Sequence, residues 1–373
     1  MKFACSKGEL FKHLQTALLC LSPKTMLPYL SFLQMETGDD SVTITSTDLE
    51  VSTRIKFKAD VKKKGKALIH GDLFGALMRV QEEKDIVIEE GKDSIGIKCG
   101  NFKADVAKGN LQDYPQIPDP PASSEKAVRI PAFHLSEMLG KTMFSASRDE
   151  VRYVLCSVYF ELAKGAFTVV ATDGKRLATT WQEAEMSKDM KVSAIVPAKT
   201  VNILPKVLSN CSEKEEVKII IDDSGIFFVT ENITMSSRLI DGTYPDYKNV
   251  IPKQVKIKAE ADKEEILNAT VRAASIYHSG ISSQNSFVKY QVSKSKLNIS
   301  AASQGFGESE EDIDVESTGG SINIAFNPGF MIDIFKHLND KKVVMEFSDS
   351  LNAVVVKSKE DPNYVALVMP MRS

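Results

Sequence analysis

Cysteine is scarce in this sequence, and its positions fit no known cysteine pattern. Five cysteines occur in 373 residues, with no CxxC pair, at Cys5, Cys20, Cys99, Cys156 and Cys211. An odd number of scattered cysteines argues against a disulfide framework, and the lack of a CxxC pair argues against a structural zinc site. The pattern fits a reducing compartment.

Long apolar runs are also missing. The longest comparable run, Ala17–Leu21, is far shorter than the roughly 20 residues that a membrane-spanning helix requires. The first residues, "MKFACSKGEL", place charges before any apolar run that could act as a signal sequence. We therefore expect a cytoplasmic protein with no membrane partner.

The usual catalytic motifs are not found. There is no Walker-type loop, GxSxG or HExxH, and the histidines are dispersed at His13, His70, His134, His278 and His337. One alternative remains, an enzyme that acts on a phosphorylated substrate through Asp173, Lys175 and Arg176 of "ATDGKRLA". That stretch is more typical of a tight turn recruited for binding, with Gly174 at a positive φ angle. We predict a non-catalytic protein with no cofactor and no metal.

The sequence does contain an internal repeat, which occurs three times. Similar stretches begin at Ser31 ("SFLQMETGDDSVTITSTDLEVSTRI"), Ser157 ("SVYFELAKGAFTVVATDGKRLATTW") and Ser286 ("SFVKYQVSKSKLNISAASQGFGESEEDI"). Each predicts a strand, a short turn, a second strand and a third. A second set of strand pairs follows each, in "EEKDIVIEEGKDSIGIKCG", "SEKEEVKIIIDDSGIFFVTE" and "NDKKVVMEFSDSLNAVVVKS".

An amphipathic helix is expected before each set, because apolar residues recur there at helical spacing. The expected helices are Lys7–Leu21, Asp72–Gln81, Phe133–Met143, Lys199–Leu208, Asp262–Arg272 and Phe330–Leu338. The fold class is therefore α+β, with two βαβββ halves in each domain. Pro205 should kink or shorten its helix.

Two linkers divide the chain into three domains, as its length leads us to expect. "PQIPDPPASSEK" and "YPDYKNVIPKQ" place the domains at residues 1–124, 125–253 and 254–373. Domains joined head to tail through equivalent surfaces either close into a ring or grow into a filament.

Four stretches in order resemble one family, the bacterial sliding clamp, which is the beta subunit of DNA polymerase III. They are "FSASRDEVRYVL", "VATDGKRLA", "LIDGTYPDY" and the terminal "VMPMR". The resemblance covers the whole chain. It implies a head-to-tail homodimeric ring whose helices line a central hole and whose sheets face outward. Such a ring encircles duplex DNA without reading its sequence, has no catalytic activity and is opened by an ATP-driven loader.

The resemblance also assigns contact residues. For DNA they are Lys24, Arg152, Tyr153 and Lys199, to which we add Arg148 for its charge and neighbourhood. The predicted helices together carry a small positive charge, although the formal net charge of the chain is −3. For the dimer, Phe102 and Ala104 of one chain should meet Ser275 and Ile276 of the other.

The last assignment is a hydrophobic pocket for short peptide motifs of the polymerase III catalytic subunit, the clamp loader, other polymerases and repair proteins. The pocket residues implied are Leu155, Thr172, Gly174, Lys175, Arg176, Leu177, Pro245, Val250, Phe330, Val368, Met369, Pro370, Met371 and Arg372. Lys175, Asn249 and Phe330 depart from the residues that are common in the family. A second alternative is a triplicated protein-binding scaffold that does not bind DNA.

Overall fold

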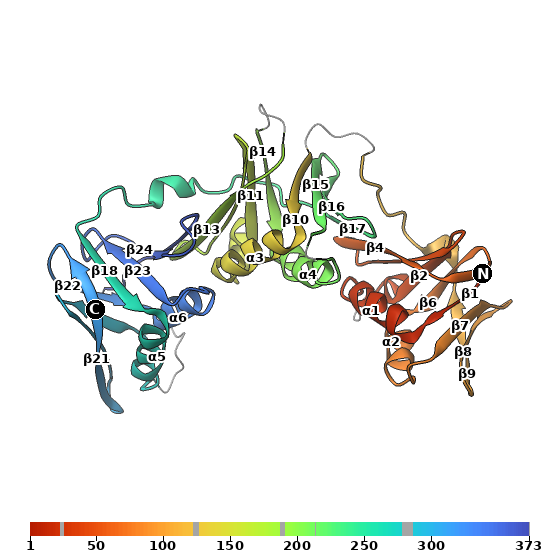
Figure 1. Cartoon of the computed structure of the whole chain (residues 1–373), viewed down its shortest axis with the longest axis horizontal. Helices are drawn as coiled ribbons and strands as arrows, with labels where there is room; N and C mark the ends of the chain where they lie inside the picture. Colours follow the sequence, from red (N-terminus) through yellow and green to blue (C-terminus); the bar gives the residue numbers. More distant parts are fainter. Residues whose placement is uncertain (23–25, 122–126, 187–190, 213, 278–285, 373) are drawn as a thin grey trace. The chain divides into compact units, whose positions relative to one another are not determined.

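The computed structural model describes residues 1–22, 26–121, 127–186, 191–212, 214–277 and 286–372 (Figure 1). These residues form two compact units. The first unit contains Met1–Ser136, Ala163–Gly165 and Ala184–Leu239, and the second contains Glu137–Leu162, Ala166–Glu183 and Ile240–Ser373. The middle repeat therefore contributes residues to both units.

All the predicted helices form, with ends that differ by a few residues from those expected. They are α1 (Lys7–Leu18), α2 (Gly71–Arg79), α3 (Ala132–Thr142), α4 (Ala198–Leu208), α5 (Lys263–Ala274) and α6 (Pro328–Lys336). Three of them start at a side chain that accepts a hydrogen bond from the first turn: Ser6 for α1, Asp262 for α5 and Asn327 for α6. These caps satisfy backbone N–H groups that lack a partner within the helix.

The expected shortening of the helix at Pro205 is wrong. Helix α4 continues past Pro205 to Leu208, and the Ser209 N–H donates to the Pro205 carbonyl at 2.9 Å. Val207 and Leu208 are buried, which favours continuing the helix over ending it at the proline. Packing thus outweighs the hydrogen bond that proline cannot donate.

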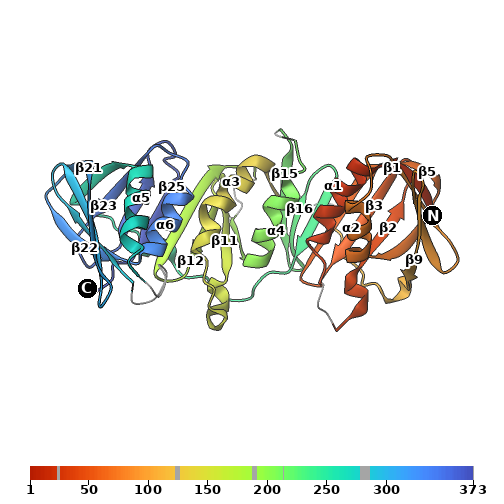
Figure 2. The same cartoon turned by 90° about the horizontal axis from the view of Figure 1, so that it is seen from below.

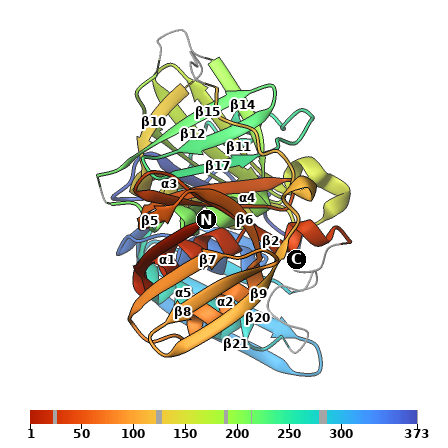
Figure 3. The same cartoon turned by 90° about the vertical axis from the view of Figure 1, so that its right-hand side faces the viewer.

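The first unit contains a sheet of thirteen strands in the order β10-β15-β16-β17-β4-β3-β2-β6-β9-β8-β7-β1-β5. Their bounds are β1 (Lys2–Ser6), β2 (Phe32–Thr37), β3 (Ser41–Thr47), β4 (Val51–Lys58), β5 (Asp60–Lys63), β6 (Gly65–His70), β7 (Asp85–Glu90), β8 (Ser94–Cys99), β9 (Phe102–Gly109), β10 (Ala127–Pro131), β15 (Glu216–Asp222), β16 (Gly225–Val229) and β17 (Ile233–Ser237). Strands β7, β8 and β9 follow one another in an antiparallel meander (Figure 3). Strand β14 (Lys191–Pro197) also belongs to this unit.

The strands of the second unit are hydrogen-bonded in the order β11-β12-β13-β25-β24-β23-β18-β21-β20-β19-β22. Their bounds are β11 (Ser157–Ala163), β12 (Ala166–Thr172), β13 (Arg176–Glu183), β18 (Ile257–Asp262), β19 (Val288–Val292), β20 (Lys296–Ser303), β21 (Gly307–Thr318), β22 (Ile322–Phe326), β23 (Lys342–Phe347), β24 (Val354–Ser358) and β25 (Tyr364–Val368). The strand triplets at Ser31, Ser157 and Ser286 are thus confirmed.

Consecutive repeats are joined by one type of strand pairing, which occurs once in each unit. In the first unit β4 pairs antiparallel with β17, so that Val51 lies opposite Ser237. In the second unit β13 pairs antiparallel with β25, so that Arg176 lies opposite Val368. In both cases the strand that ends a triplet pairs with the last strand of the next repeat.

Apolar faces of the helices cover the sheets and form the cores. Helix α1 lies beside α2, and α5 lies beside α6 (Figure 2). Leu10, Leu14 and Phe74 are fully buried in the first unit, as are Ile266 and Phe335 in the second. No helix within the described residues is long and apolar enough to cross a membrane.

Candidate functional site

The "ATDG" stretch folds as a tight turn between β12 and β13. Oδ1 of Asp173 accepts hydrogen bonds from the backbone N–H groups of Lys175 at 2.8 Å and Arg176 at 2.9 Å. Oγ1 of Thr172 accepts from the Gly174 N–H and donates to the Arg176 carbonyl. Gly174 has a φ angle of +83°, as the sequence predicted, because a side chain there would be strained.

Arg176 is held under this turn by two carboxylates. Its side chain is 8% exposed, and its Nε and Nη1 atoms lie 3.1 Å from Asp173 and 2.6 Å from Asp333. The guanidinium carbon also lies 4.6 Å from the centroid of the Phe330 ring. Because its guanidinium already pairs with two carboxylates, Arg176 is poorly suited to bind a phosphate group. We infer that it holds the turn in position.

Above the turn is a cavity of about 140 Å³ with mostly apolar walls. Its lining comes from the turn and β13, from the segment around Pro245, and from the end of β25. The lining residues are Leu155, Thr172, Gly174, Lys175, Arg176, Leu177, Pro245, Asp246, Tyr247, Val250, Ala353, Leu367 and Met369. Val250 is 53% exposed and Met369 is 45% exposed, so apolar groups face solvent at the mouth.

The C-terminal wall is fastened on both sides of Pro370. The Met369 N–H donates to the Lys175 carbonyl at 2.8 Å, which extends the pairing of β25 with β13 by one residue. The Met371 N–H donates to the carbonyl of Ala325 in β22 at 2.7 Å. This wall is therefore ordered before any ligand arrives, which lowers the entropic cost of binding.

The opposite wall, around Tyr247, is fixed by a half-buried acidic group. The Tyr247 hydroxyl donates to Glu161 at 2.8 Å, and Nζ of Lys248 lies 2.8 Å from the same carboxylate. Burial, and then the hydrogen bond to Glu161, raise the pKa of the Tyr247 phenol above its usual range. The Tyr159 ring stacks on Tyr244 with centroids 4.8 Å apart, and so supports the same wall.

Most of the predicted pocket residues line this cavity, and five lie outside the lining. Val368 is fully buried in the core, and Phe330 lies beneath Arg176. Pro370, Met371 and Arg372 follow the lining residue Met369. The prediction omitted Asp246, Tyr247, Ala353 and Leu367. The first two belong to the quoted "LIDGTYPDY" and could have been found, whereas Ala353 carries no sequence signal.

The residues predicted to contact DNA differ in how free their side chains are. Lys24 lies outside the described residues. Arg148 and Tyr153 are exposed, the latter by 58%. Arg152 donates to the Asp173 carbonyl at 2.8 Å and pairs with Asp149.

Lys199 lies 2.6 Å from Asp48 and 2.7 Å from Glu50. Burial lowers the pKa of its ammonium group, but hydrogen bonds to these two carboxylates outweigh burial and raise that pKa overall. The lysine is charged, but its charge is already compensated within the protein.

The predicted dimer residues lie at two places in the fold, one on a strand and one at the end of a helix. Phe102 and Ala104 lie in β9, and Ser275 and Ile276 directly follow α5. Ile276 lies close to Gly307 at the start of β21, and the Ser309 hydroxyl of β21 donates to the Ala273 carbonyl of α5 at 3.0 Å.

The described residues contain no group of three or more acidic, histidine or cysteine side chains arranged to hold a metal.

Three repeated α+β domains with antiparallel sheets define a clamp-type protein, and comparison with known proteins gives the family. Residues 1–118, 129–246 and 248–372 match the N-terminal, central and C-terminal domains of the DNA polymerase III beta subunit. The chain therefore belongs to the DNA polymerase III beta subunit family, that of the sliding clamps.

Individual relatives agree over the full length. A beta sliding clamp of Chlamydia pneumoniae is 31% identical over 375 residues, which cover 100% of this chain and 99% of the relative. The crystal structure of a Pseudomonas aeruginosa sliding clamp bound to griselimycin has a TM-score of 0.94 at 26% identity, with both chains fully covered. The Bacillus subtilis sliding clamp has a TM-score of 0.93 at 25% identity and covers 100% of this chain and 99% of its own.

We expect Asp173→Ala to lower the free energy of unfolding by about 2–3 kcal/mol, because it removes the acceptor of two backbone N–H groups and one partner of a buried guanidinium. Asp349→Ala is the matched control, since Asp349 accepts from the N–H groups of Leu351 and Asn352 in an exposed turn. That control should cost clearly less, because its hydrogen bonds are exposed to water. Urea unfolding of both variants measures the difference, and equal losses would contradict the role assigned to Arg176.

Proposed function

We propose that this chain is a processivity factor: two copies close into a ring around duplex DNA, and the apolar pocket tethers polymerases to that ring. The observation that carries the proposal is the repeated pairing of β4 with β17 and of β13 with β25. In each pairing, the strand that ends a triplet pairs with the last strand of the next repeat. Two such strands have no partner of this kind within the described part of the chain: β21, which ends the last triplet, and β9, which ends the first repeat. We propose that they pair with each other between two chains.

Both strands have backbone groups available for such pairing. Strand β9 pairs with β6 at Lys108 and Gly109, while its earlier residues pair with β8. Residues Gly307–Asp314 of β21 pair with β20, and only its last residues, Val315–Thr318, pair with β18. An antiparallel contact between β9 of one chain and β21 of another would be heterologous, and a second copy of it would close the ring.

Charge favours this pairing. Lys98 and Lys103 lie opposite each other on β8 and β9, and both are exposed. Glu308, Glu310 and Asp312 are exposed along β21. Complementary surfaces of this kind accelerate association and suppress wrong partners. Phe102 and Ala104 on one side, and Ser275 and Ile276 on the other, would lie at the ends of this contact.

The DNA role needs only weak contacts with phosphates, because a closed ring is retained by topology rather than by affinity. Arg148 is the best placed of the predicted residues, since it is exposed and has no ion pair within the described residues. Lys12 on α1 and Lys206 on α4 share these properties. We propose that these cations face the duplex, with Arg152, Tyr153, Lys199 and Lys24 as further contacts.

The pocket suits a short hydrophobic peptide from a polymerase, a clamp loader or a repair protein. Its walls are apolar and fixed in advance, and Met369 supplies a flexible, polarizable surface that can adapt to different side chains. Lys175 is exposed at the rim and has no ion pair within the described residues. We place the protein in the cytoplasm, with domains at residues 1–124, 125–253 and 254–373, and assign it no catalytic activity.

Lys103→Glu should weaken the dimer about tenfold or more, because it places a carboxylate opposite the acidic β21 strand. Wild-type protein should have a mass in solution near twice 41.1 kDa, and the variant should dissociate at higher concentrations. Lys58→Glu on β4 is the control, since Lys58 is equally exposed in the same unit and outside the proposed contact. A monomeric wild-type protein would refute the ring.

The chain should stay on nicked circular DNA after loading and leave when the circle is cut, because only a closed ring is topologically linked. Neutralising Lys24, Arg148 and Lys199 together should reduce loading without lowering the dimer mass. Retention that survives linearisation would contradict encirclement. Failure to bind DNA, with intact peptide binding, would favour a protein-binding scaffold.

Met369→Ala should weaken the binding of a polymerase C-terminal peptide about tenfold, because the side chain forms part of the pocket wall. Met26→Ala is the matched control, since Met26 is 98% exposed and lies in the other unit. Fluorescence anisotropy with a labelled peptide measures both. A chain that ends at Val368 should lose binding entirely, and undiminished affinity of that truncated chain would overturn the pocket assignment.

A further inference from the structure

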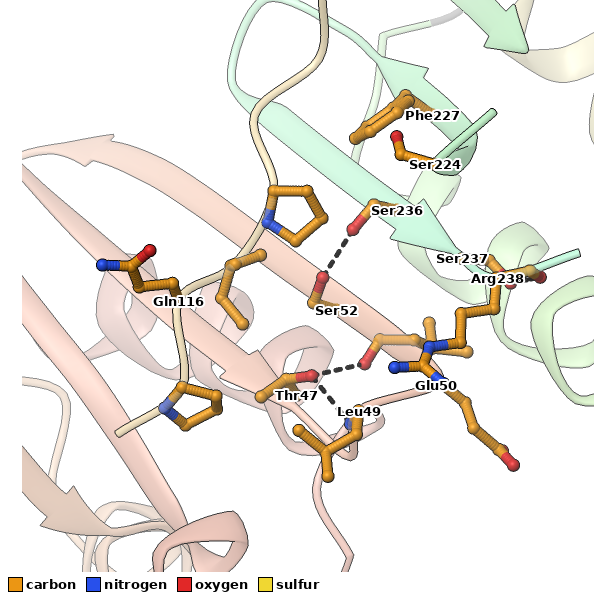
Figure 4. A pocket seen from close by; sticks show the side chains of 14 residues that line it. Thr47, Leu49, Glu50, Ser52, Gln116, Ser224, Phe227, Ser236, Ser237 and Arg238 are labelled. Atoms are coloured by element: carbon orange, nitrogen blue, oxygen red, sulfur yellow. Dashed lines mark hydrogen bonds between the residues drawn. The ribbon is translucent and has the colours of Figure 1, made fainter. Parts of the chain in front are cut away.

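The first unit contains a second cavity, of about 220 Å³, beside the pairing of β4 with β17 (Figure 4). One wall is the turn from Thr47 to Ser52. The second comes from β16, β17 and Arg238, and the third is the segment Pro115–Pro118. Arg54 of β4 fastens that third wall, because its guanidinium donates to the Ile117 carbonyl and pairs with Asp119.

One wall of this cavity is a turn of the same type as the turn below the apolar pocket. Oδ1 of Asp48 accepts from the N–H groups of Glu50 at 3.0 Å and Val51 at 2.9 Å, as Asp173 does for Lys175 and Arg176. Leu49 has a φ angle of +75°, against +83° for Gly174. The cavity is therefore the counterpart of the pocket in the preceding repeat.

The neighbouring strand is attached in the same way too. The Arg238 N–H donates to the Glu50 carbonyl at 2.9 Å, and the Met369 N–H donates to the Lys175 carbonyl at 2.8 Å. Arg238 thus occupies the place in this cavity that Met369 occupies in the pocket. The wall of this cavity therefore carries the guanidinium of Arg238 at the point where the pocket carries the thioether of Met369.

The lining has changed from apolar to polar. Hydroxyl groups of Thr47, Ser52, Ser224, Ser236 and Ser237 line the cavity, and Ser52 is hydrogen-bonded to Ser236 at 2.5 Å. A hydroxyl can donate one hydrogen bond and accept two. Thr47, Ser224 and Ser237 already donate to Val51, Asp222 and Arg238, so their oxygens keep the capacity to accept from a ligand. Pro115 and Ile117 supply an apolar surface beside them, and the buried Phe227 lies behind it.

The charge at the cavity is set by Arg238. Among the described residues that line it, only Glu50 and Arg238 are charged. Glu50 is paired with Lys199 at 2.7 Å. Arg238 is exposed, and its guanidinium has no ion pair or hydrogen bond within the part of the chain that the structure describes. In Figure 4 its side chain extends toward the turn that holds Thr47 and Leu49.

We propose that this cavity binds a short peptide segment that carries a carboxylate side chain. Arg238 presents a planar fork of donors that matches a carboxylate in a two-point contact. The hydroxyl oxygens accept hydrogen bonds from the peptide's N–H groups, and Pro115 and Ile117 contact its aliphatic part. The site differs from the apolar pocket in chemistry, and the proposal does not depend on the ligand of that pocket.

The test uses the full chain with ¹³C-labelled isoleucine and methionine methyl groups, and two acetylated, amidated pentapeptides, Ala-Leu-Glu-Leu-Ala and Ala-Leu-Gln-Leu-Ala. The glutamate peptide should shift the Ile117 methyl resonance and bind about tenfold more tightly than the glutamine peptide. Arg238→Gln should abolish that preference. Arg79→Gln, which changes an exposed arginine on α2, should leave the preference intact.

Three outcomes would overturn the proposal. The Ile117 resonance does not move with either peptide, or the two peptides bind equally to the wild-type chain. Alternatively, sodium acetate shifts Ile117 as strongly as the glutamate peptide does at equal concentration, which would reduce the cavity to an anion site. The methyl resonance of Met369 reports peptide entry into the apolar pocket, so binding there is read separately.

Discussion

The structure depends on one interaction, the antiparallel pairing of the strand that ends a triplet with the last strand of the next repeat. It occurs as β4 with β17 and as β13 with β25. Backbone hydrogen bonds fix the register of such a ladder, so whatever lies at its end is placed with equal precision. Each cavity described above lies at the end of one of these two ladders.

Repetition of the backbone has left the side chains free to diverge. The turns at Asp48 and Asp173 make the same hydrogen bonds, yet one leads to hydroxyl groups and Arg238, and the other to Leu177, Leu367 and Met369. Backbone geometry is set by turn chemistry, whereas ligand chemistry is set by the residues displayed on it. The two repeats therefore share the backbone arrangement of these turns, while the cavities beside them differ in chemistry.

Much of the fold could be predicted because local signals agree with it. Helical spacing predicted α1 to α6, although not the short 3-10 helices, and "ATDG" predicted a turn with Gly174 at positive φ. The length of α4 could not be predicted from Pro205 alone, because burial of Val207 and Leu208 decides it. In the pocket, the contributions of Ala353 and Leu367 depend on the pairing of β24 with β25, a register that no short motif specifies.

The charges on β8, β9 and β21 also affect which strand edges of two chains can pair. An unpaired strand edge can add a strand from any neighbour and so begin a stack of misassembled chains. Two β9 edges would bring the exposed Lys103 of each copy close to the other, and two β21 edges would bring Glu308 and Glu310 close to the same residues of another copy. Charge repulsion therefore disfavours pairing between two copies of the same edge.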